Sequence, residues 1–235
     1  MHIQEYVGGT GFFPGIKSRL INEKLFLLSS PGPLRILTSA LLGADLKFAR
    51  HIFNYTVAHT YNKMNPREDL ETIARRISRD NDVVGLMTAV YVKDIVLTVK
   101  SSPGLAAAAF STVGLGNPGA AGYSAELIRQ EYKPGTINSI VLIDGNLSMA
   151  ALVNGVITAT EAKTRALVEA GLKFRDGTNV TGTTTDTIAI ACTIRGAEKM
   201  YAGTATDLGY LIGSTVYESI REGIRKIKLP RGSRR

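Results

Sequence analysis

Glycine- and proline-rich turns interrupt this chain so often that the apolar runs between them have the length of β-strands. The turns are VGGTGFFPG (7–15), SSPGP (29–33), SSPG (101–104), GLGNPGAAG (114–122) and YKPG (132–135). Glycine marks a turn because it adopts left-handed backbone conformations, and proline does so because its ring fixes φ. This punctuation predicts many short strands.

Seven apolar segments are candidate strands. Residues 16–22 and 24–30 predict a hairpin whose turn lies near Asn22 and Glu23. The others are residues 34–41, 94–102, 105–113, 137–144 and 187–194. The last two are the clearest, because their β-branched residues suit a pleated surface and turns bound their ends.

Helical signals mark the longer segments between these strands. The predicted helices cover residues 66–80, 148–171 and 206–227, with a shorter one over 124–132. Pro66 occupies a first helical position, with acidic residues in the first turn and basic ones at the end. Ser148 and Thr206 are N-cap residues, whose side-chain oxygens can accept hydrogen bonds from the first turn.

Strands mixed with helices predict an α+β fold, an α/β sandwich in which mixed β-sheets pack against helices. No linker separates two parts, so we expect one domain over residues 1–235, with a core of about 25–220 and a basic tail at 221–235. A chain of 235 residues is long enough to bury a sizeable core.

The net charge of +8 suggests nucleic-acid binding at first sight, but its distribution argues against that partner. Residues 221–235 hold seven basic residues and one acid, whereas the rest of the chain holds 21 basic and 19 acidic residues. No aromatic residues interleave with the basic run as stacking platforms would. We therefore expect a solvated tail and no nucleic acid, with weak RNA binding by the tail as the alternative.

Cysteine content and hydropathy predict a cytoplasmic protein. Cys192 is the one cysteine, so no disulfide forms within the chain. No apolar run is long enough to cross a bilayer, so we expect no membrane association. The first nine residues lack the basic start and apolar core of a signal peptide.

The stretch GLGNPG (114–119) matches the dinucleotide-binding pattern G-x-G-x-x-G and follows an apolar run. A true fingerprint opens a helix whose N-terminus faces the pyrophosphate. Here Pro118 falls between the second and third glycines, and Gly122 follows before a helix could lengthen. The pattern therefore favours a bent loop over a phosphate cradle.

The common metal-binding and hydrolase motifs do not occur in the sequence, so they predict no site. The histidines are His2, His51 and His59, and no H-E-x-x-H, Cys-x-x-Cys, P-loop or G-x-S-x-G motif occurs. What stands out is a density of threonine and small residues in PGTINSIVLIDG, VITATEAKT and VTGTTTDTIAIAC. A threonine hydroxyl can donate, accept or attack, although turn and cap chemistry explains such residues equally well.

These threonine-rich stretches carry a resemblance to a known family. The segments are GTINSIVLID, LVNGVITATEAKTRALVEAG, TGTTTDTIAIAC and YAGTATDLGYLIGSTVYESI, preceded by PLRILTSALLG, FNYTVAHTYN, VGLMTAV and STVGLGNPG. In this order they resemble the adenosylcobinamide amidohydrolase family over about residues 25–220.

The resemblance implies an enzyme of cobinamide salvage, of the archaeal type. Such enzymes hydrolyse the amide that joins the corrin propionate arm to aminopropanol in adenosylcobinamide. The products are adenosylcobyric acid and 1-amino-2-propanol, on the way to coenzyme B12. The cobalt belongs to the corrinoid substrate, so we expect no cofactor and no protein metal site, and we leave a homo-oligomer open.

A weaker resemblance suggests the mechanism. The order PGTINSIVLIDGNLS, helix, TDTIAIACT is similar to self-cleaving aminopeptidases related to ornithine acetyltransferase. It implies an αββα arrangement of the N-terminal-nucleophile type. The hydroxyl residue that follows the cleaved glycine is the nucleophile in those enzymes, and Thr136 after Gly135 matches it.

The expected catalytic residues are Thr136 as nucleophile, Asn117 as oxyanion donor, and Glu161 and Asp186 as acid, base or orienting groups. The expected substrate-binding residues are Asn54, His59, Tyr61, Thr181 and Thr185. Each has an ordinary structural alternative; Glu161, for example, could pair with Arg165 at i+4. The rival mechanism uses water activated by Glu161 or Asp186, and the rival function is a non-catalytic corrinoid- or nucleotide-binding module.

Overall fold

The computed structural model describes residues 3–5, 13–130 and 134–228. Its strands are β1 (Ile3–Glu5), β2 (Lys17–Ile21), β3 (Leu25–Thr38), β4 (Asp45–Thr56), β5 (Val83–Thr88), β6 (Val96–Ser102), β7 (Leu105–Val113), β8 (Pro118–Gly119), β9 (Ile137–Asp144), β10 (Asn146–Leu147), β11 (Gly182–Thr183), β12 (Thr187–Cys192) and β13 (Glu198–Lys199). Its helices are α1 (Pro66–Ile77), the 3₁₀ helix η1 (Val92–Asp94), α2 (Ala125–Gln130), α3 (Met149–Glu169) and α4 (Asp207–Lys228).

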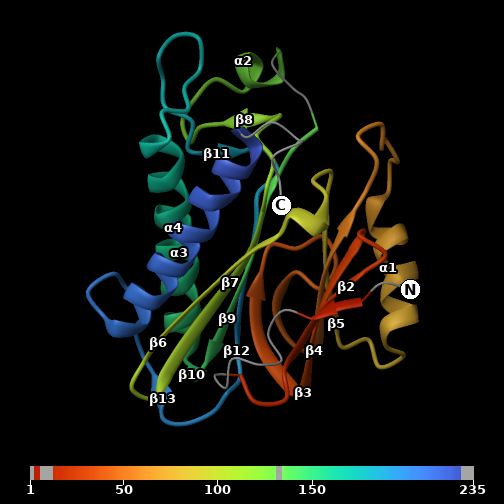
Figure 1. Cartoon of the computed structure of the whole chain (residues 1–235), viewed down its shortest axis with the longest axis vertical. Coiled ribbons are helices and arrows are strands. Elements are labelled where there is room, and N and C mark those ends of the chain that lie inside the picture. Colours follow the sequence, from red (N-terminus) through yellow and green to blue (C-terminus); the bar gives the residue numbers. More distant parts are fainter. Residues whose placement is uncertain (1–2, 6–12, 131–133, 229–235) are drawn as a thin grey trace.

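One nine-stranded mixed sheet organises the chain, in the order β1-β2-β3-β12-β9-β7-β6, with β4 on β3 and β5 on β4. The pairs β9–β12 and β4–β5 are parallel, and the other pairs within this sheet are antiparallel. Strand β3 joins the two halves, because its first part pairs with β2 and its last part pairs with β12. The sheet folds over at β3, so that β2–β5 face β7, β9 and β12 (Figure 1).

Three hydrophobic clusters separate four layers. The first lies between α3, α4 and the half-sheet of β7, β9 and β12. The second fills the space between the two half-sheets, and the third lies between β4, β5 and α1. The layers are therefore helix, sheet, sheet and helix, as Figure 1 shows from left to right, which confirms the α+β prediction and its αββα form.

Alternation along β9 shows how the central half-sheet is built. Val141 and Ile143 pack under the helices, whereas Ile140 and Leu142 face the other half-sheet. Both faces are buried, so the strand is apolar along most of its length. Asn138 and Ser139 are buried polar exceptions, and Asn138, on the same face as Ile140, leads to the site.

Several local predictions are confirmed. The hairpin turns at Asn22 and Glu23, whose φ angles are +49° and +59°. The Ser148 hydroxyl accepts from the Ala151 amide at 3.1 Å, and the Thr206 hydroxyl accepts from the Gly209 amide at 3.0 Å, so both residues cap their helices.

Other local predictions are wrong or incomplete. Residues 24–30 and 34–41 are not separate strands: β3 runs through the prolines at 31 and 33, and the irregularity falls in its pairing with β4 between Ser29 and Leu34. Proline is tolerated where a ladder is interrupted, since it lacks only the amide donor. Strands β4 and β5 were not predicted at all.

The basic segment 221–235 divides in two. Residues 221–228 are the last turns of α4, and 229–235 lie outside the described residues, as do parts of the turns at 7–15 and 132–135. Within the described part of the chain, no helix has the length and apolar character needed to cross a membrane.

Candidate active site

Thr136 stands immediately before β9, at the edge where the core between the two half-sheets becomes polar. The residue is buried, and its carbonyl accepts from the Gly114 amide at 2.9 Å, which continues the β7–β9 pairing. Its hydroxyl donates to the Thr185 carbonyl at 2.7 Å and lies 3.4 Å from Asn138 Oδ1. These contacts hold the side chain in one place.

The glycine loop that follows β7 packs on the peptide before Thr136. A Cβ added at Gly135 would lie 2.6 Å from the Gly116 nitrogen and 3.1 Å from the Gly114 oxygen. Only glycine therefore fits at 135 without moving the loop. The contact brings residues 114–117 against the Gly135–Thr136 bond.

Asn117 is the buried side chain of this loop. Its Nδ2 donates to the hydroxyls of Thr184 at 2.8 Å and Thr185 at 3.2 Å, while its Oδ1 is buried with no hydrogen-bond partner. That oxygen lies 3.1 Å from the position of a Cβ on Gly135. An unpaired buried acceptor is costly, so this amide is the polar group of the site most open to a change of partner.

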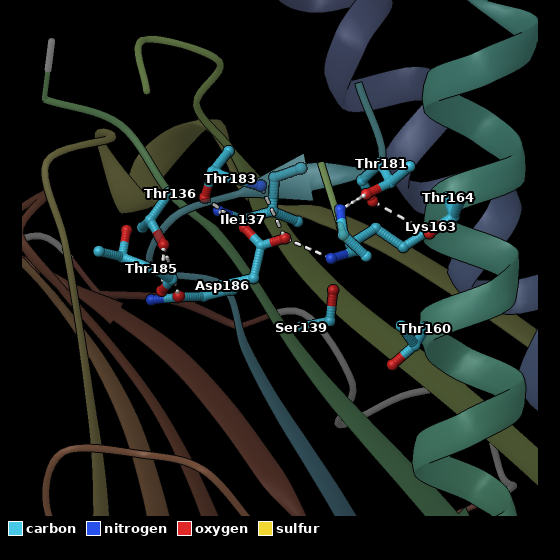
Figure 2. Close-up of polar contacts among 12 residues, drawn as sticks. Thr136, Ile137, Ser139, Thr160, Lys163, Thr164, Thr181, Thr183, Thr185 and Asp186 are labelled. Carbon is cyan, nitrogen blue, oxygen red and sulfur yellow. Dashed lines mark hydrogen bonds and ion pairs between the residues drawn. The ribbon is translucent and has the colours of Figure 1, made fainter. Parts of the chain in front are cut away.

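Asp186 and Lys163 form a buried ion pair beside the same loop (Figure 2). The carboxylate also accepts from the Thr183 hydroxyl, from the Thr183 amide at 3.0 Å and from the Ile137 amide at 3.1 Å. Both carboxylate oxygens are therefore occupied, and the amide next to Thr136 is one of their donors.

Asn138 connects the site to the opposite half-sheet. Its Nδ2 donates to Asn54 Oδ1 at 3.0 Å and to the Met87 carbonyl at 2.9 Å, and Asn54 in turn donates to the Thr112 hydroxyl at 3.1 Å. Asn54 is 2% exposed. Asn54 supports Asn138 from the opposite half-sheet. It does not line the cavity described below, so its position does not support the expectation that it contacts substrate.

A cavity of about 690 Å³ extends from Thr136 along this edge. One wall is the segment 57–63 after β4, with Met87, Thr88 and Ala89 at the end of β5; the other is formed by residues 134–136 and 185–187. The cavity brings together Thr136, Thr185, Asp186, His59 and Tyr61 of the predicted site residues. These residues come from three separate parts of the chain.

Tyr61 is tied to α1 at the rim of this cavity. Its hydroxyl donates to Asp69 at 2.8 Å, and Lys63 donates to the same carboxylate at 2.7 Å. Burial and the hydrogen bond to Asp69 raise the pKa of Tyr61 to about 12, so its hydroxyl stays protonated and neutral. The Lys63 ammonium and the Tyr61 hydroxyl lower the pKa of Asp69. The rim therefore presents a fixed aromatic ring, and His59 beside it is exposed.

Glu161 and Thr181 do not reach the cavity. Glu161 lies on the exposed side of α3 and lines a different hollow with Tyr210 and Tyr217, so its expected acid–base role is not supported. Arg165, the ion-pair partner suggested above for Glu161, pairs with Glu169 instead. Thr181 holds the surrounding loops: its hydroxyl accepts from the Ala121 amide at 3.0 Å.

The dinucleotide pattern is not a phosphate cradle. After β7 the glycine loop enters β8, which pairs with β11, and α2 begins only at Ala125. The glycines thus shape the loop over Gly135 rather than a helix N-terminus. Among the described residues, no three histidine, cysteine, aspartate or glutamate side chains group closely enough to hold a metal ion.

Sequence reasoning missed Lys163, Asn138 and the steric role of Gly135. Two of these left a signal: Lys163 lies among the buried alanines of α3, and Asn138 lies in a strand whose buried residues are mostly apolar. A charged or amide side chain in a buried row needs a partner, which is a reason to examine it.

Comparison with known proteins supports a family assignment. A family model described as "Adenosylcobinamide amidohydrolase" matches residues 14–229. A Methanosarcina mazei protein named "Adenosylcobinamide amidohydrolase" is 31% identical over 208 residues, which are 82% of this chain and 91% of that protein. A Halobacterium salinarum protein of the same name is 33% identical over 91 residues, 39% of this chain and 36% of that protein.

Solved structures are more distant. A "Burkholderia sp. beta-aminopeptidase" aligns with a TM-score of 0.44 and 12% identity, over 86% of this chain and 77% of that one. The sequence matches therefore carry the assignment.

Proposed function

The chain belongs to the adenosylcobinamide amidohydrolase family, and we propose that it hydrolyses the amide between the corrin propionate arm and aminopropanol in adenosylcobinamide. The products are adenosylcobyric acid and 1-amino-2-propanol, a salvage step toward coenzyme B12. The observation that carries the choice of site is Thr136, a buried hydroxyl that lines a cavity of about 690 Å³ next to Asn117.

Thr136 is the nucleophile in this proposal. Its hydroxyl oxygen bonds to the amide carbonyl carbon, the C–N bond breaks, and aminopropanol leaves with a proton. The corrin propionate remains as an ester on Thr136 until water hydrolyses it to the acid. A covalent intermediate divides one difficult hydrolysis into two easier steps.

The hydroxyl needs a base, and its two hydrogen-bond partners are a backbone carbonyl and an amide oxygen. Neither takes a proton near neutral pH. We propose that the base is the α-amine of Thr136, released when the chain cleaves itself after Gly135. In that step the hydroxyl adds to the Gly135 carbonyl, the peptide nitrogen leaves as the amine, and water hydrolyses the ester to a Gly135 carboxylate. A free α-amine has a pKa of about 8, which suits a base near neutral pH.

Asn117 is the proposed oxyanion donor. Its two hydroxyl partners, on Thr184 and Thr185, can donate as well as accept. A half-turn of the amide would give its oxygen a donor in Thr184 and aim its NH₂ toward Gly135. The unpaired Oδ1 supports this exchange, because it removes a buried acceptor that has no partner.

Asp186 orients the site in this proposal rather than taking a proton. Both of its oxygens already accept hydrogen bonds or pair with Lys163. A water mechanism would need one of those oxygens to be released, and Glu161 is not near the cavity. The nucleophilic mechanism is therefore preferred.

The cavity suits the reacting arm of the substrate. Its volume falls within the range of sites that enclose drug-sized ligands, whereas a corrinoid is larger. We propose that the aminopropanol arm enters toward Thr136 and that the ring rests at the mouth, against His59 and Tyr61. Cobalt arrives within the substrate, so the proposal includes no cofactor or metal of the protein. A cytoplasmic location and a homo-oligomer remain proposals of the same kind.

Two variants test the proposal. The protein is incubated with adenosylcobinamide, and aminopropanol is measured by mass spectrometry. Thr136→Ala should lose at least three orders of magnitude in kcat, about the share that a nucleophile contributes. The control is Thr72→Ala, which removes an exposed hydroxyl on α1 and should keep full activity. Wild-type activity in Thr136→Ala would refute the nucleophile, and tight cobinamide binding without turnover by the wild type would favour a binding module.

The base is tested on the same samples. Intact mass should reveal chains ending at Gly135 and starting at Thr136 in the active protein, and none in Thr136→Ala. Full activity in an uncleaved chain would rule out the α-amine as base while leaving Thr136 as nucleophile.

A further inference from the structure

Lys163 is a buried cation to which the reaction proposed above gives no role. It is 7% exposed and extends from α3 toward the sheet (Figure 2). We propose that Lys163 is a positioning residue, which fixes Thr136 through the carboxylate of Asp186. This inference rests on the proposed function of Thr136.

The surroundings of Lys163 hold a charge that is expensive to bury alone. Its neighbours on the inner side of α3 are alanines, at 159, 162 and 166, and these small residues are themselves buried. A cation in such a place needs an opposite charge in contact with it. Asp186 supplies that charge, with its side chain 12% exposed against 9% for Lys163.

The space around the pair is closed on a third side. A Cβ on Gly182 would lie 2.6 Å from Asp186 Oδ2 and 2.7 Å from Lys163 Nζ. Strand β11, which contains Gly182, therefore passes directly over the ion pair. On the side of this strand, little room is left for the ammonium or the carboxylate to move.

Asp186 transmits this arrangement to Thr136 by two routes. Its Oδ1 accepts from the Ile137 amide at 3.1 Å, which fixes the peptide after Thr136. Its own backbone follows Thr185, whose carbonyl accepts from the Thr136 hydroxyl at 2.7 Å. Both routes begin at Asp186, whose carboxylate Lys163 ties to α3.

Loss of the ammonium would leave the Asp186 carboxylate buried without its counter-charge. Breaking a buried pair from one side is strongly unfavourable, so the carboxylate would turn toward water. The Ile137 amide and the turn at 183–186 would then lose their common acceptor. Thr136 would remain present but no longer be held against its neighbours.

The test compares Lys163→Met with Arg165→Met. Arg165 is on the same helix and pairs with Glu169 in solvent, so its removal also deletes one ion pair from α3. We measure kcat and KM for adenosylcobinamide with the full chain, and Tm by calorimetry. Lys163→Met should lower kcat about 10- to 100-fold, as small misplacements of catalytic groups do, with KM little changed. Lys163→Arg, which keeps the charge, should recover part of that loss, and Arg165→Met should match the wild type.

A second comparison asks whether Lys163 acts through Thr136. Adding Lys163→Met to Thr136→Ala should cause no further loss of residual rate, because no nucleophile remains to be positioned. If Lys163→Met does not fold, the double variant Lys163→Met/Asp186→Asn replaces it, because it leaves no unpaired charge buried. The same loss in kcat is expected for the double variant.

The inference is overturned if the Lys163 variant has the kcat of Arg165→Met, or if its loss is undiminished in the Thr136→Ala background. Normal kcat in Lys163→Met with an inactive Thr136→Ala would refute the positioning role alone. An active Thr136→Ala would instead refute the proposed nucleophile, and a wild type that releases no aminopropanol would refute the proposed function.

Discussion

Replacing Gly135 with alanine is the sharpest test of how the glycine loop and Thr136 fit together. The added Cβ would meet the Gly116 nitrogen at 2.6 Å, and ordinary contact begins near 3.4 Å. The loop or the peptide before Thr136 must therefore move by about 0.8 Å. The nearest neighbour is backbone, so no flexible side chain can absorb this shift.

The expected cost follows from that displacement. Overpacking of this kind typically destabilises by about 1–3 kcal/mol. For a domain of this length, each kcal/mol lowers Tm by about 2–4 °C, so we expect a fall of about 2–12 °C. A shift approaching 1 Å beside a nucleophile should also lower kcat by about 100-fold.

The assay combines calorimetry with release of aminopropanol from adenosylcobinamide. Gly32→Ala is the control, because a Cβ there meets nothing within 4 Å and φ is not in the left-handed region. It should retain both Tm and kcat. If Gly135→Ala behaves like Gly32→Ala, the loop is not packed against the Gly135–Thr136 bond and the reasoning fails.

Two further predictions concern the neighbouring residues. Asn117→Ala should lower kcat by about 10²–10³, the usual effect of losing one oxyanion donor, with little change in KM; a raised KM with an unchanged kcat would show a binding role instead. Glu161→Gln should leave kcat within about twofold of the wild type, because surface substitutions rarely exceed 0.5 kcal/mol and the side chain lies outside the cavity. The measurement is kcat for this variant over a range of adenosylcobinamide concentrations. A hundredfold fall in kcat would restore Glu161 as a catalytic candidate.

Helix starts were predictable because their signals are local. Pro66, Ser148 and Thr206 each act on the turn that follows them, and the structure keeps each in that role. Strands β4 and β5 were not predictable in the same way. Strand β4 pairs with the strand directly before it, but charged residues interrupt its apolar pattern. Strand β5 pairs with β4 across helix α1, and it is a short apolar run with a glycine inside it, which periodicity alone does not distinguish from other buried segments.

The site was predictable to the extent that motifs determined it. Ordered motifs pointed to Thr136, Asn117, Thr185 and Asp186, and the fold brings these together. Motifs could not show which side of α3 faces them. Glu161 and Lys163 are two positions apart, enough on a helix to place one in solvent and the other beside Asp186.

The hydrogen bonds of Asn138 to Asn54 and to the Met87 carbonyl have a consequence for the shape of the cavity. They tie the strand of Thr136 to the two parallel strands whose ends carry the opposite wall. The width of the cavity is therefore set by how the two half-sheets pack against each other in the interior. Changes in the loops at the mouth can alter the contacts made to the outer part of the substrate. A substrate arm of different width would require the two half-sheets to pack at a different separation.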